Sequence, residues 1–291
     1  MIHLITLNPA IDEYLNLDQF EVGSTNYVAA KHQVMGGKAV NVAKVLQNLK
    51  QSATLVTTVD YQNQFVSSSL EAYNAFLIEV DSIRTNLKIN NNGIITEINE
   101  RGEALSDIAK LKFENYIKKC VDPEDIVLIA GNPHADDEQF QYQLALLAKN
   151  NGARLFLDSN RFTFEMLREI EPEFIKPNDQ ELESLLAGGL ELSQLTASVN
   201  KVIVSHGSKG FTYYDDKCSI HEEPIKGEPI NSVGAGDSLV AGFIYAIVNN
   251  LPLADSLLVA KYCASATVYS GQIAPLKCVK QYDKSGIIPI D

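Results

Sequence analysis

The stretch Asn-Ser-Val-Gly-Ala-Gly-Asp-Ser-Leu-Val-Ala-Gly-Phe at residues 231–243 joins a run of small residues directly to an apolar helical pattern that begins at Gly236. Small residues let backbone N–H groups approach a ligand closely, and a helix N-terminus favours a negative charge. Asp237 stands beside this potential anion hole, where it would repel a bound phosphate. A general base that takes a hydroxyl proton, while the N–H groups hold a phosphoryl group in transit, explains its presence. A tight turn with a helix cap explains the same string equally well.

On the N-terminal side of this stretch, short β-rich runs alternate with longer helical patterns. Several runs are continuously apolar, as expected for strands covered on both faces. The alternation predicts βαβ units, and hence an α/β fold with a largely parallel sheet. The expected strands are Ile2–Leu7, Ala53–Val59, Phe76–Val80, Ile126–Ala130, Arg154–Asp158 and Val202–Ser205. The expected helices are Lys38–Leu49, Gln64–Tyr73, Ala109–Lys119, Gln139–Asn150, Asp179–Ala187, Gly236–Asn249 and Leu253–Tyr269.

Two early stretches interrupt this alternation. The first has no helical pattern, and the second contains Asn90-Asn91-Asn92-Gly93 between alternating residues, which is a strong hairpin signal. We expect the two stretches, at about residues 12–35 and 83–101, to form a small β-sheet that serves as a lid or an interface. We expect the chain, residues 1–291, to be a single domain.

A second glycine-led segment, Gly-Gly-Lys-Ala-Val-Asn at residues 36–41, also opens an expected helix. Lys38 lies in the first turn, where a cation is unfavourable unless it faces a bound anion. Asn8 and Asp12 follow the first expected strand, where they would hydrogen-bond the hydroxyl groups of a sugar. A glycine hinge with a solvated lysine explains the first segment as well, and a surface turn explains the second.

Two more segments follow expected strands. In Ile-Lys-Pro-Asn-Asp-Gln-Glu-Leu at residues 175–182, Asn178 and Glu181 have the spacing of a capping box. The alternative is that both side chains hold the water ligands of Mg²⁺ near nucleotide phosphates. In Val-Ile-Val-Ser-His-Gly-Ser-Lys-Gly at residues 202–210, a buried strand leads into a glycine-rich turn. That turn either passes under a nucleotide or joins a hairpin.

Composition restricts the partners. The formal net charge is −13, which disfavours general binding to nucleic acid or to anionic lipid and requires a local basic cluster for any anionic substrate. The start of the chain has no signal-peptide pattern, and no apolar run approaches the length of a membrane span. The four cysteines are scattered, which fits a reducing compartment. We expect a cytoplasmic protein.

The order of the motifs is more specific than any one of them. Together they resemble the ribokinase-like (PfkB) carbohydrate kinases, and most closely the branch that holds 1-phosphofructokinase and tagatose-6-phosphate kinase. The resemblance covers essentially the whole chain. It rests on Asn-Pro-Ala-Ile-Asp (8–12), Gly-Gly-Lys-Ala-Val-Asn-Val-Ala (36–43), Lys-Pro-Asn-x-x-Glu-Leu (176–182), Val-Ser-x-Gly-x-x-Gly (204–210) and Gly-Ala-Gly-Asp (234–237). It implies an α/β/α sandwich with a mostly parallel central sheet and a small β-sheet lid.

The resemblance also implies a role for each motif. Asp237 would deprotonate the acceptor hydroxyl, beside an anion hole formed by the N–H groups of Gly234, Ala235 and Gly236. Asn178 and Glu181 would organise Mg²⁺ through water. The residues implied at the nucleotide, ATP, are Ser205, Gly207, Ser208, Gly210 and Gly236. The residues implied at the sugar are Asp12, Gly37, Lys38 and Asn41.

A basic cluster grips the existing phosphate of the sugar in this branch. Lys38, Arg84 and Lys88 occupy the matching places, and a guanidinium with two ammonium groups suits a phosphate dianion. The alternative for Arg84 and Lys88 is a solvated edge strand, where charges discourage aggregation. The lid of this family often doubles as a dimer interface, so the resemblance implies a homodimer.

We therefore expect an Mg·ATP-dependent kinase that acts on the primary hydroxyl of a ketohexose phosphate. The preferred reaction converts fructose 1-phosphate to fructose 1,6-bisphosphate. Three alternatives stay open: tagatose 6-phosphate as the acceptor, an unphosphorylated sugar or a nucleoside as the acceptor, and a sugar-phosphate-binding regulator that keeps the fold without turnover.

Overall fold

A nine-stranded sheet forms the centre of the molecule in the computed structural model, which describes residues 1–288. Its order is β13-β12-β11-β10-β9-β8-β1-β4-β5, and every neighbouring pair from β11 to β5 is parallel. At the other edge, β12 and β13 are antiparallel. The strands are β1 (Ile2–Thr6), β4 (Thr54–Val59), β5 (Ala75–Glu79), β8 (Ile126–Ala130), β9 (Arg154–Asp158), β10 (Phe174–Ile175), β11 (Lys201–Ser205), β12 (Phe211–Tyr214) and β13 (Ser219–Glu222).

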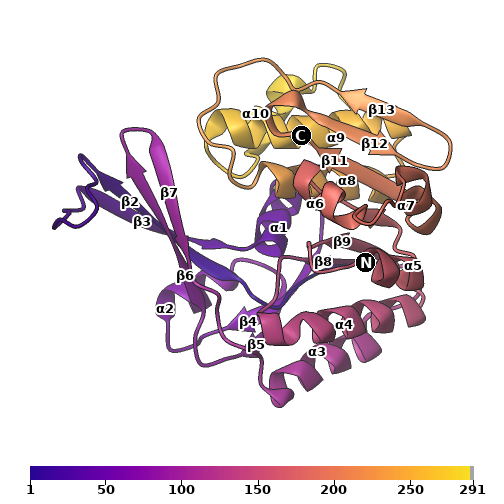
Figure 1. Cartoon of the computed structure of the whole chain (residues 1–291), viewed down its shortest axis with the longest axis horizontal. Coiled ribbons are helices and arrows are strands. Elements are labelled where there is room, and N and C mark those ends of the chain that lie inside the picture. Colours follow the sequence, from indigo (N-terminus) through magenta and orange to yellow (C-terminus); the bar gives the residue numbers. More distant parts are fainter. Residues whose placement is uncertain (289–291) are drawn as a thin grey trace.

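Helices cover both faces of this sheet (Figure 1), because the buried strands direct alternate apolar side chains to opposite sides. In β1, for example, Leu4 packs in one core cluster and Ile5 in the other. The first cluster contains α1 (Lys38–Asn48), α2 (Gln64–Leu70), α8 (Ala235–Val248), α9 (Leu253–Ser270) and α10 (Leu276–Tyr282). The second contains α3 (Asp107–Cys120), α4 (Glu138–Asn150), α5 (Phe164–Ile170) and α7 (Leu192–Ser198), with α6 (Asp179–Leu185) packed against it.

The predicted α/β sandwich is confirmed, and each expected strand and helix is present with its ends within three residues of the predicted ones. In the part of the chain that the structure describes, the α-helices α5, α7 and α10 were not predicted. Seven residues give only a weak helical period. Two equally short helices, α2 and α6, were nevertheless predicted, and α6 has a capping box in addition. Within residues 1–288, no helix is long and apolar enough to cross a membrane.

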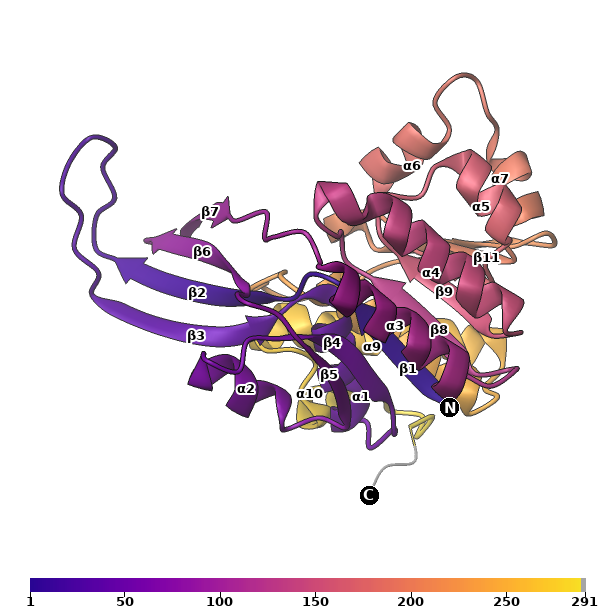
Figure 2. The same cartoon turned by 90° about the horizontal axis from the view of Figure 1, so that it is seen from below.

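The predicted small sheet is also present, and it projects from the body of the molecule (Figure 2). Its order is β3-β2-β6-β7, with β2 and β6 parallel to each other. The strands are β2 (Ala10–Leu17), β3 (Ala30–Gly36), β6 (Arg84–Asn91) and β7 (Ile94–Asn99). The β6–β7 turn places Asn92 and Gly93 at φ 51° and 90°, as the Asn-Gly signal predicts. We call these four strands the small sheet.

The parallel strands bring their carboxyl ends to one edge of the central sheet, which is where ligands bind in open α/β folds. β9 ends at Asp158, β10 is followed by Lys176, and β11 ends at Ser205. The N-termini of α1 and α8 bring Lys38 and Asp237 to this edge as well.

Candidate functional site

Asp237 lies in the first turn of α8 and is 8% exposed. Gly234 caps this helix in the left-handed region at φ 79°. The amide of Ala235 donates to the carbonyl oxygen of Ser232 at 3.1 Å. Of the three amides predicted for the anion hole, that of Ala235 is therefore engaged within the protein, whereas that of Gly236 lies in the first turn, which has no intrahelical acceptor.

Burial changes the proton affinity of Asp237. Desolvation, with the nearby charge of Asp158, raises the pKa of the Asp237 carboxyl group to about 6. A hydrogen bond of 2.7 Å from Asn41 Nδ2 to Asp237 Oδ2, and the charges of Lys38 and Lys176, act in the opposite direction. A carboxylate with a pKa near neutrality is a better base than an ordinary aspartate.

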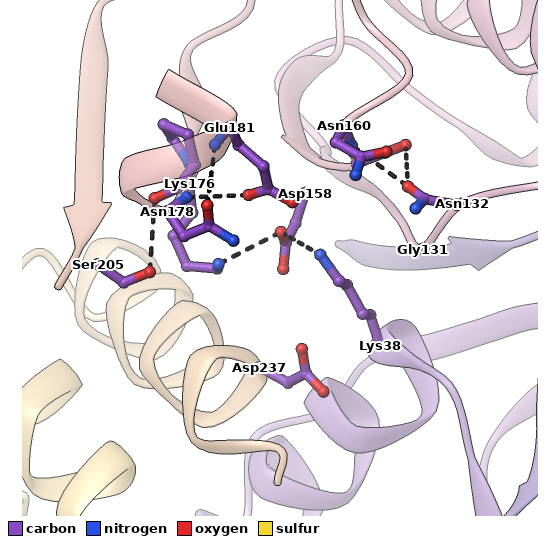
Figure 3. Close-up of polar contacts among 12 residues, drawn as sticks. Lys38, Gly131, Asn132, Asp158, Asn160, Lys176, Asn178, Glu181, Ser205 and Asp237 are labelled. Atoms are coloured by element: carbon purple, nitrogen blue, oxygen red, sulfur yellow. Dashed lines mark hydrogen bonds and ion pairs between the residues drawn. The ribbon is translucent and has the colours of Figure 1, made fainter. Parts of the chain in front are cut away.

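Two lysines converge on Asp158, a residue that the sequence motifs did not reveal (Figure 3). Lys38 Nζ lies 2.9 Å from Asp158 Oδ1, and Lys176 Nζ lies 3.5 Å from the same oxygen. A Cβ atom placed on Gly236 would be only 3.4 Å from Lys176 Nζ, so this ammonium group lies directly beside the start of α8. Lys38, expected to face a bound anion, is thus paired with a carboxylate of the protein.

The charges of this triad depend on one another. Burial alone would raise the pKa of Asp158, but the ammonium groups of Lys176 and Lys38 hold it below its usual range. Burial would likewise lower the pKa of Lys38, and the charge of Asp158 raises it instead. Asp158 Oδ2 is buried and has no hydrogen-bond partner among the described residues. Such an orphaned carboxylate oxygen suits a cation or a water that a cation holds.

A second cluster lies on the small sheet around Asp12, which accepts a 2.9 Å hydrogen bond from Asn86 Nδ2. Lys88 Nζ is 3.6 Å from Asp12 Oδ2 and 3.8 Å from Glu97 Oε1, and its side chain is 6% exposed. A Cβ atom on Gly36 would lie 2.4 Å from Asp12 Oδ2, so this carboxylate requires a glycine at the end of β3. The predicted alternative of a solvated lysine at position 88 is wrong, because Lys88 is buried.

Arg84 begins β6 and bonds uncharged oxygens rather than a carboxylate. Its guanidinium donates to the carbonyl oxygens of Asn8 and Glu100 at 3.3 and 3.2 Å, and to Asn86 Oδ1 at 3.0 Å. Burial lowers the pKa of this guanidinium. Asn86 therefore bonds both Arg84 and Asp12. Since Lys88 also pairs with Asp12, Arg84 and Lys88 belong to one network.

Asn178 and Glu181 form the predicted capping box at the start of α6. Asn178 Oδ1 accepts from the amide of Glu181, and Glu181 Oε2 accepts from the amide of Asn178, both at 2.9 Å. The box uses one oxygen of the Glu181 carboxylate. Its other oxygen is a hard ligand of the kind that hydrated Mg²⁺ takes, so the cap and the metal role are compatible.

The segment from Ser205 to Gly210 joins β11 to β12, so the predicted hairpin is confirmed. The amide of Ser205 donates to the carbonyl oxygen of Pro177 at 3.0 Å, which holds this turn against the start of α6. Gly210 has φ 87°, and a Cβ atom there would lie 2.0 Å from the carbonyl oxygen of Glu222. Gly207 also has a positive φ, of 58°, while Ser208 is exposed. A nucleotide role for this turn stays a prediction.

A family model described as pfkB family carbohydrate kinase matches residues 5–276, which is most of the chain. The chain belongs to this family. Asp237, with its Gly-Ala-Gly lead, lies within the matched region of this carbohydrate kinase, as do both lysines of the triad. The predicted resemblance is thereby confirmed.

The curated relatives of this kinase include the two enzymes of the expected branch. It is 28% identical over 295 residues to 1-phosphofructokinase of Borreliella burgdorferi, covering 97% of this chain and 96% of the relative. It is 28% identical over 268 residues to tagatose-6-phosphate kinase of Staphylococcus epidermidis, covering 86% of each chain. The structure of Methanocaldococcus jannaschii nucleoside kinase, a ribokinase-family member, matches with a TM-score of 0.75 at 23% identity, over 98% of this chain and 99% of that one. That likeness supports the ribokinase-like fold.

A cavity of about 670 Å³ borders the Asn178–Glu181 capping box of this kinase. Lys176, Asn178 and Glu181 line it together with α5 and the loop after β9. The structure therefore brings Asp237, Asn41, Lys38, Lys176 and Asp158 together in one cluster, and Asp12, Arg84 and Lys88 together in another. The sequence motifs missed Asp158 and the charge of Lys176. The sequence signal for both was their position, since Asp158 is the last residue of one parallel strand and Lys176 directly follows another.

Proposed function

We propose that this kinase transfers the γ-phosphoryl group of ATP to the primary hydroxyl of a ketohexose phosphate. The preferred acceptor is fructose 1-phosphate, and the product is fructose 1,6-bisphosphate. One observation carries the proposal: a buried carboxylate, Asp237, stands beside the free first-turn amides of α8 and near the ammonium groups of two lysines. A binding protein without turnover has no use for a base beside an anion hole.

Asp237 takes the proton of the acceptor hydroxyl. The hydroxyl oxygen forms a bond to the γ-phosphorus of ATP, and the bond between that phosphorus and the β-phosphate oxygen breaks. Asn41 holds Asp237 Oδ2 in place, which leaves Oδ1 for the hydroxyl. The amides from Gly236 onward and the ammonium group of Lys176 stabilise the charge on the phosphoryl oxygens. Positioning and charge neutralisation supply most of the acceleration in such reactions.

Asn178 and Glu181 would hold Mg²⁺ through water, with the orphaned oxygen of Asp158 on the same side of the site. When bound, Mg²⁺ neutralises phosphate charge. Ser205, Gly207, Ser208 and Gly210 would border the nucleotide, because their turn is bonded to the start of α6.

Asp12, Gly37, Lys38 and Asn41 would hold the sugar, and Arg84 and Lys88 would bind its phosphate. The small sheet would close over the acceptor as a lid and exclude water, which limits hydrolysis of ATP. The face of the small sheet opposite to Arg84 and Lys88 carries Ile94 and Ile98, which are 71% and 53% exposed. Exposed apolar residues on a sheet face mark an interaction site, so we include a homodimer through the lid in the proposal.

Coupled release of ADP, measured with Mg·ATP, tests the proposal on fructose 1-phosphate, fructose 6-phosphate, tagatose 6-phosphate, fructose and ribose. We expect saturable turnover on a phosphorylated ketose, with fructose 1-phosphate preferred. Turnover on tagatose 6-phosphate alone would reassign the acceptor, in keeping with the Staphylococcus relative. No turnover on any acceptor would overturn the proposal in favour of a regulator.

Variants of the small sheet test the phosphate site. Lys88→Met and Arg84→Ala should each raise the KM for the sugar phosphate about 10- to 100-fold, as for loss of a charged hydrogen bond. Lys31→Met is the matched control, since Lys31 lies on the same sheet but its side chain is 69% exposed and pairs with Glu13. Activity confined to unphosphorylated sugars, with no change in KM in these variants, would contradict the role of both cations.

A further inference from the structure

His206 joins two parts of the site that the motifs treat separately. Its Nδ1 atom lies 2.6 Å from Asp179 Oδ1 at the start of α6, and its Nε2 atom lies 2.9 Å from Thr212 Oγ1 on β12. Thr212 Oγ1 is in turn 3.0 Å from Nδ1 of His221 on β13. Both ring nitrogens of His206 therefore have a partner, and its side chain is only 20% exposed.

Hydrogen-bond chemistry gives this chain a direction. The Asp179 carboxylate accepts, so Nδ1 of His206 carries the proton that it donates. In a neutral His206, Nε2 then accepts the single hydroxyl proton of Thr212, and the Thr212 oxygen accepts from His221. The bonds run from His221 through Thr212 and His206 to Asp179, and each donor has an acceptor.

The backbone of His206 closes the turn that would border the nucleotide. Its amide donates to the carbonyl oxygen of Gly210 at 2.8 Å, and its carbonyl oxygen accepts from the amide of Lys209 at 3.2 Å. Asp179, at the other end of the link, directly follows Asn178 and precedes Glu181 by two residues. A shift of the His206 side chain would therefore move the turn relative to the capping box.

We infer that His206 is a positioning residue that fixes the nucleotide turn relative to Asn178 and Glu181, so that the nucleotide and its metal ion bind as one unit. The inference rests on the proposed function, which gives these two segments their ligands. The imidazole contacts neither the acceptor cluster on the small sheet nor Asp237. Its loss should therefore change nucleotide binding without changing acceptor binding.

The test measures steady-state kinetics and the binding of Mg·ATP by calorimetry. His206→Leu, which removes both bonds, should raise the KM and the Kd for Mg·ATP about three- to tenfold, the range for the loss of a hydrogen bond. The turnover number and the KM for the sugar phosphate should stay within about twofold. His206→Asn places an amide near the position of Nδ1, retains the bond to Asp179, and should restore most of the affinity.

Two further variants separate this link from general damage. Asp179→Ala removes one of the two bonds that His206→Leu removes, so it should weaken Mg·ATP binding by the same amount or less. The double variant should be no worse than His206→Leu alone, because the bond between the two side chains is already lost in that variant. His134→Asn is the matched control: His134 is 23% exposed and lies near Asp136 at the start of another short helix. It should leave Mg·ATP binding unchanged.

The outcomes separate the inference from the proposed function. Additive losses in the double variant, failure of His206→Asn to rescue, or an equal rise in both KM values would overturn the role of His206 and leave the kinase intact. Weakened and rescued Mg·ATP binding in a chain that phosphorylates no sugar would overturn the proposed acceptor and leave His206 in its role. Absence of Mg·ATP binding in the native chain would overturn both.

Discussion

At the scale of single residues, Asp237 is subject to opposing effects. Burial and the charge of Asp158 favour the protonated carboxyl group, whereas Asn41, Lys38 and Lys176 favour the carboxylate. The result is a pKa of about 6, well above that of an exposed aspartate. With this pKa the group is ionised at neutral pH, as the proposed general base must be, and it can still hold a transferred proton.

This environment predicts the acidic side of the pH profile. A base works only when deprotonated, so kcat should be constant above neutrality and should fall as the pH drops through about 6, where Asp237 gains a proton. Asp158→Asn removes the repelling charge and frees two ammonium groups, and it should move this fall to lower pH. A fall that stays in place in Asp158→Asn would belong to a substrate phosphate and would contradict the assignment to Asp237.

The residues found from the sequence and those it missed differ in kind. The residues found from the sequence lie in short motifs, whose glycines and helix caps can be recognised from neighbouring residues alone. These residues are Asp237, Lys38, Asn178 and Glu181. Asp158 enters the site only because β9 lies beside β8 and β10, at a register that no local pattern contains. The sequence can show that a strand ends at Asp158, but not which lysines face it.

At the scale of elements, the start of α8 contains two glycines, and each position requires glycine for a different physical reason. Gly234 needs its left-handed φ of 79°, and a Cβ atom there would lie 2.3 Å from Ile273 Cδ1. Gly236 is helical, and a Cβ atom there would meet only the end of Lys176, at 3.4 Å. The first glycine serves the fold, and the second leaves space in front of the helix.

Substitution by alanine at each position should distinguish the structural role of Gly234 from the proposed catalytic role of Gly236. Gly234→Ala should cost about 1–2 kcal/mol for the left-handed backbone, with more for the contact with Ile273. Its Tm should fall by about 2–4 °C for each kcal/mol. Gly236→Ala should keep its Tm, because alanine is favoured in a helix, and should lower kcat about 10²-fold by displacing the phosphoryl group. Thermal unfolding and initial rates check both, and a Gly236→Ala variant with full activity would contradict the anion hole.

The long elements followed from the sequence because their periods are clear. The apolar α8 and the continuous runs of β8 and β9 are buried on all sides, as their composition predicts. The helices α5, α7 and α10 did not follow, since one face of a seven-residue helix places only two or three apolar residues in register and the pattern is weak. The equally short α6 had a second signal, its capping box. Tertiary packing, rather than local preference, stabilises such helices.

At the scale of the whole molecule, a net charge of −13 surrounds a site rich in cations. Those cations are held by carboxylates of the protein: Lys38 and Lys176 by Asp158, and Lys88 by Asp12 and Glu97. The local basic cluster that the composition demanded is therefore partly neutralised within the chain itself. An arriving phosphate competes with carboxylates for these ammonium groups, which favours ligands with a full dianionic charge.

The exposed face of the small sheet predicts self-association. Ile94→Lys with Ile98→Lys should convert a dimer to a monomer, because two charges would be buried in the interface. Ile108→Lys with Leu111→Lys is the matched control on α3, since these side chains are 71% and 54% exposed against 71% and 53% for the first pair. Sedimentation equilibrium gives the mass of each variant. An unchanged mass in the first double variant would rule out the lid as the interface.

The most direct measurement compares the native chain with Asp237→Asn in single-turnover phosphoryl transfer from Mg·ATP to the preferred ketose phosphate. Asparagine keeps the shape of the side chain and a bond to Asn41 but does not accept the hydroxyl proton. We predict a rate lower by about 10²- to 10⁴-fold, the contribution of a general base, with both substrates bound at near-native affinity. A rate close to that of the native chain, with both substrates bound, would contradict the account.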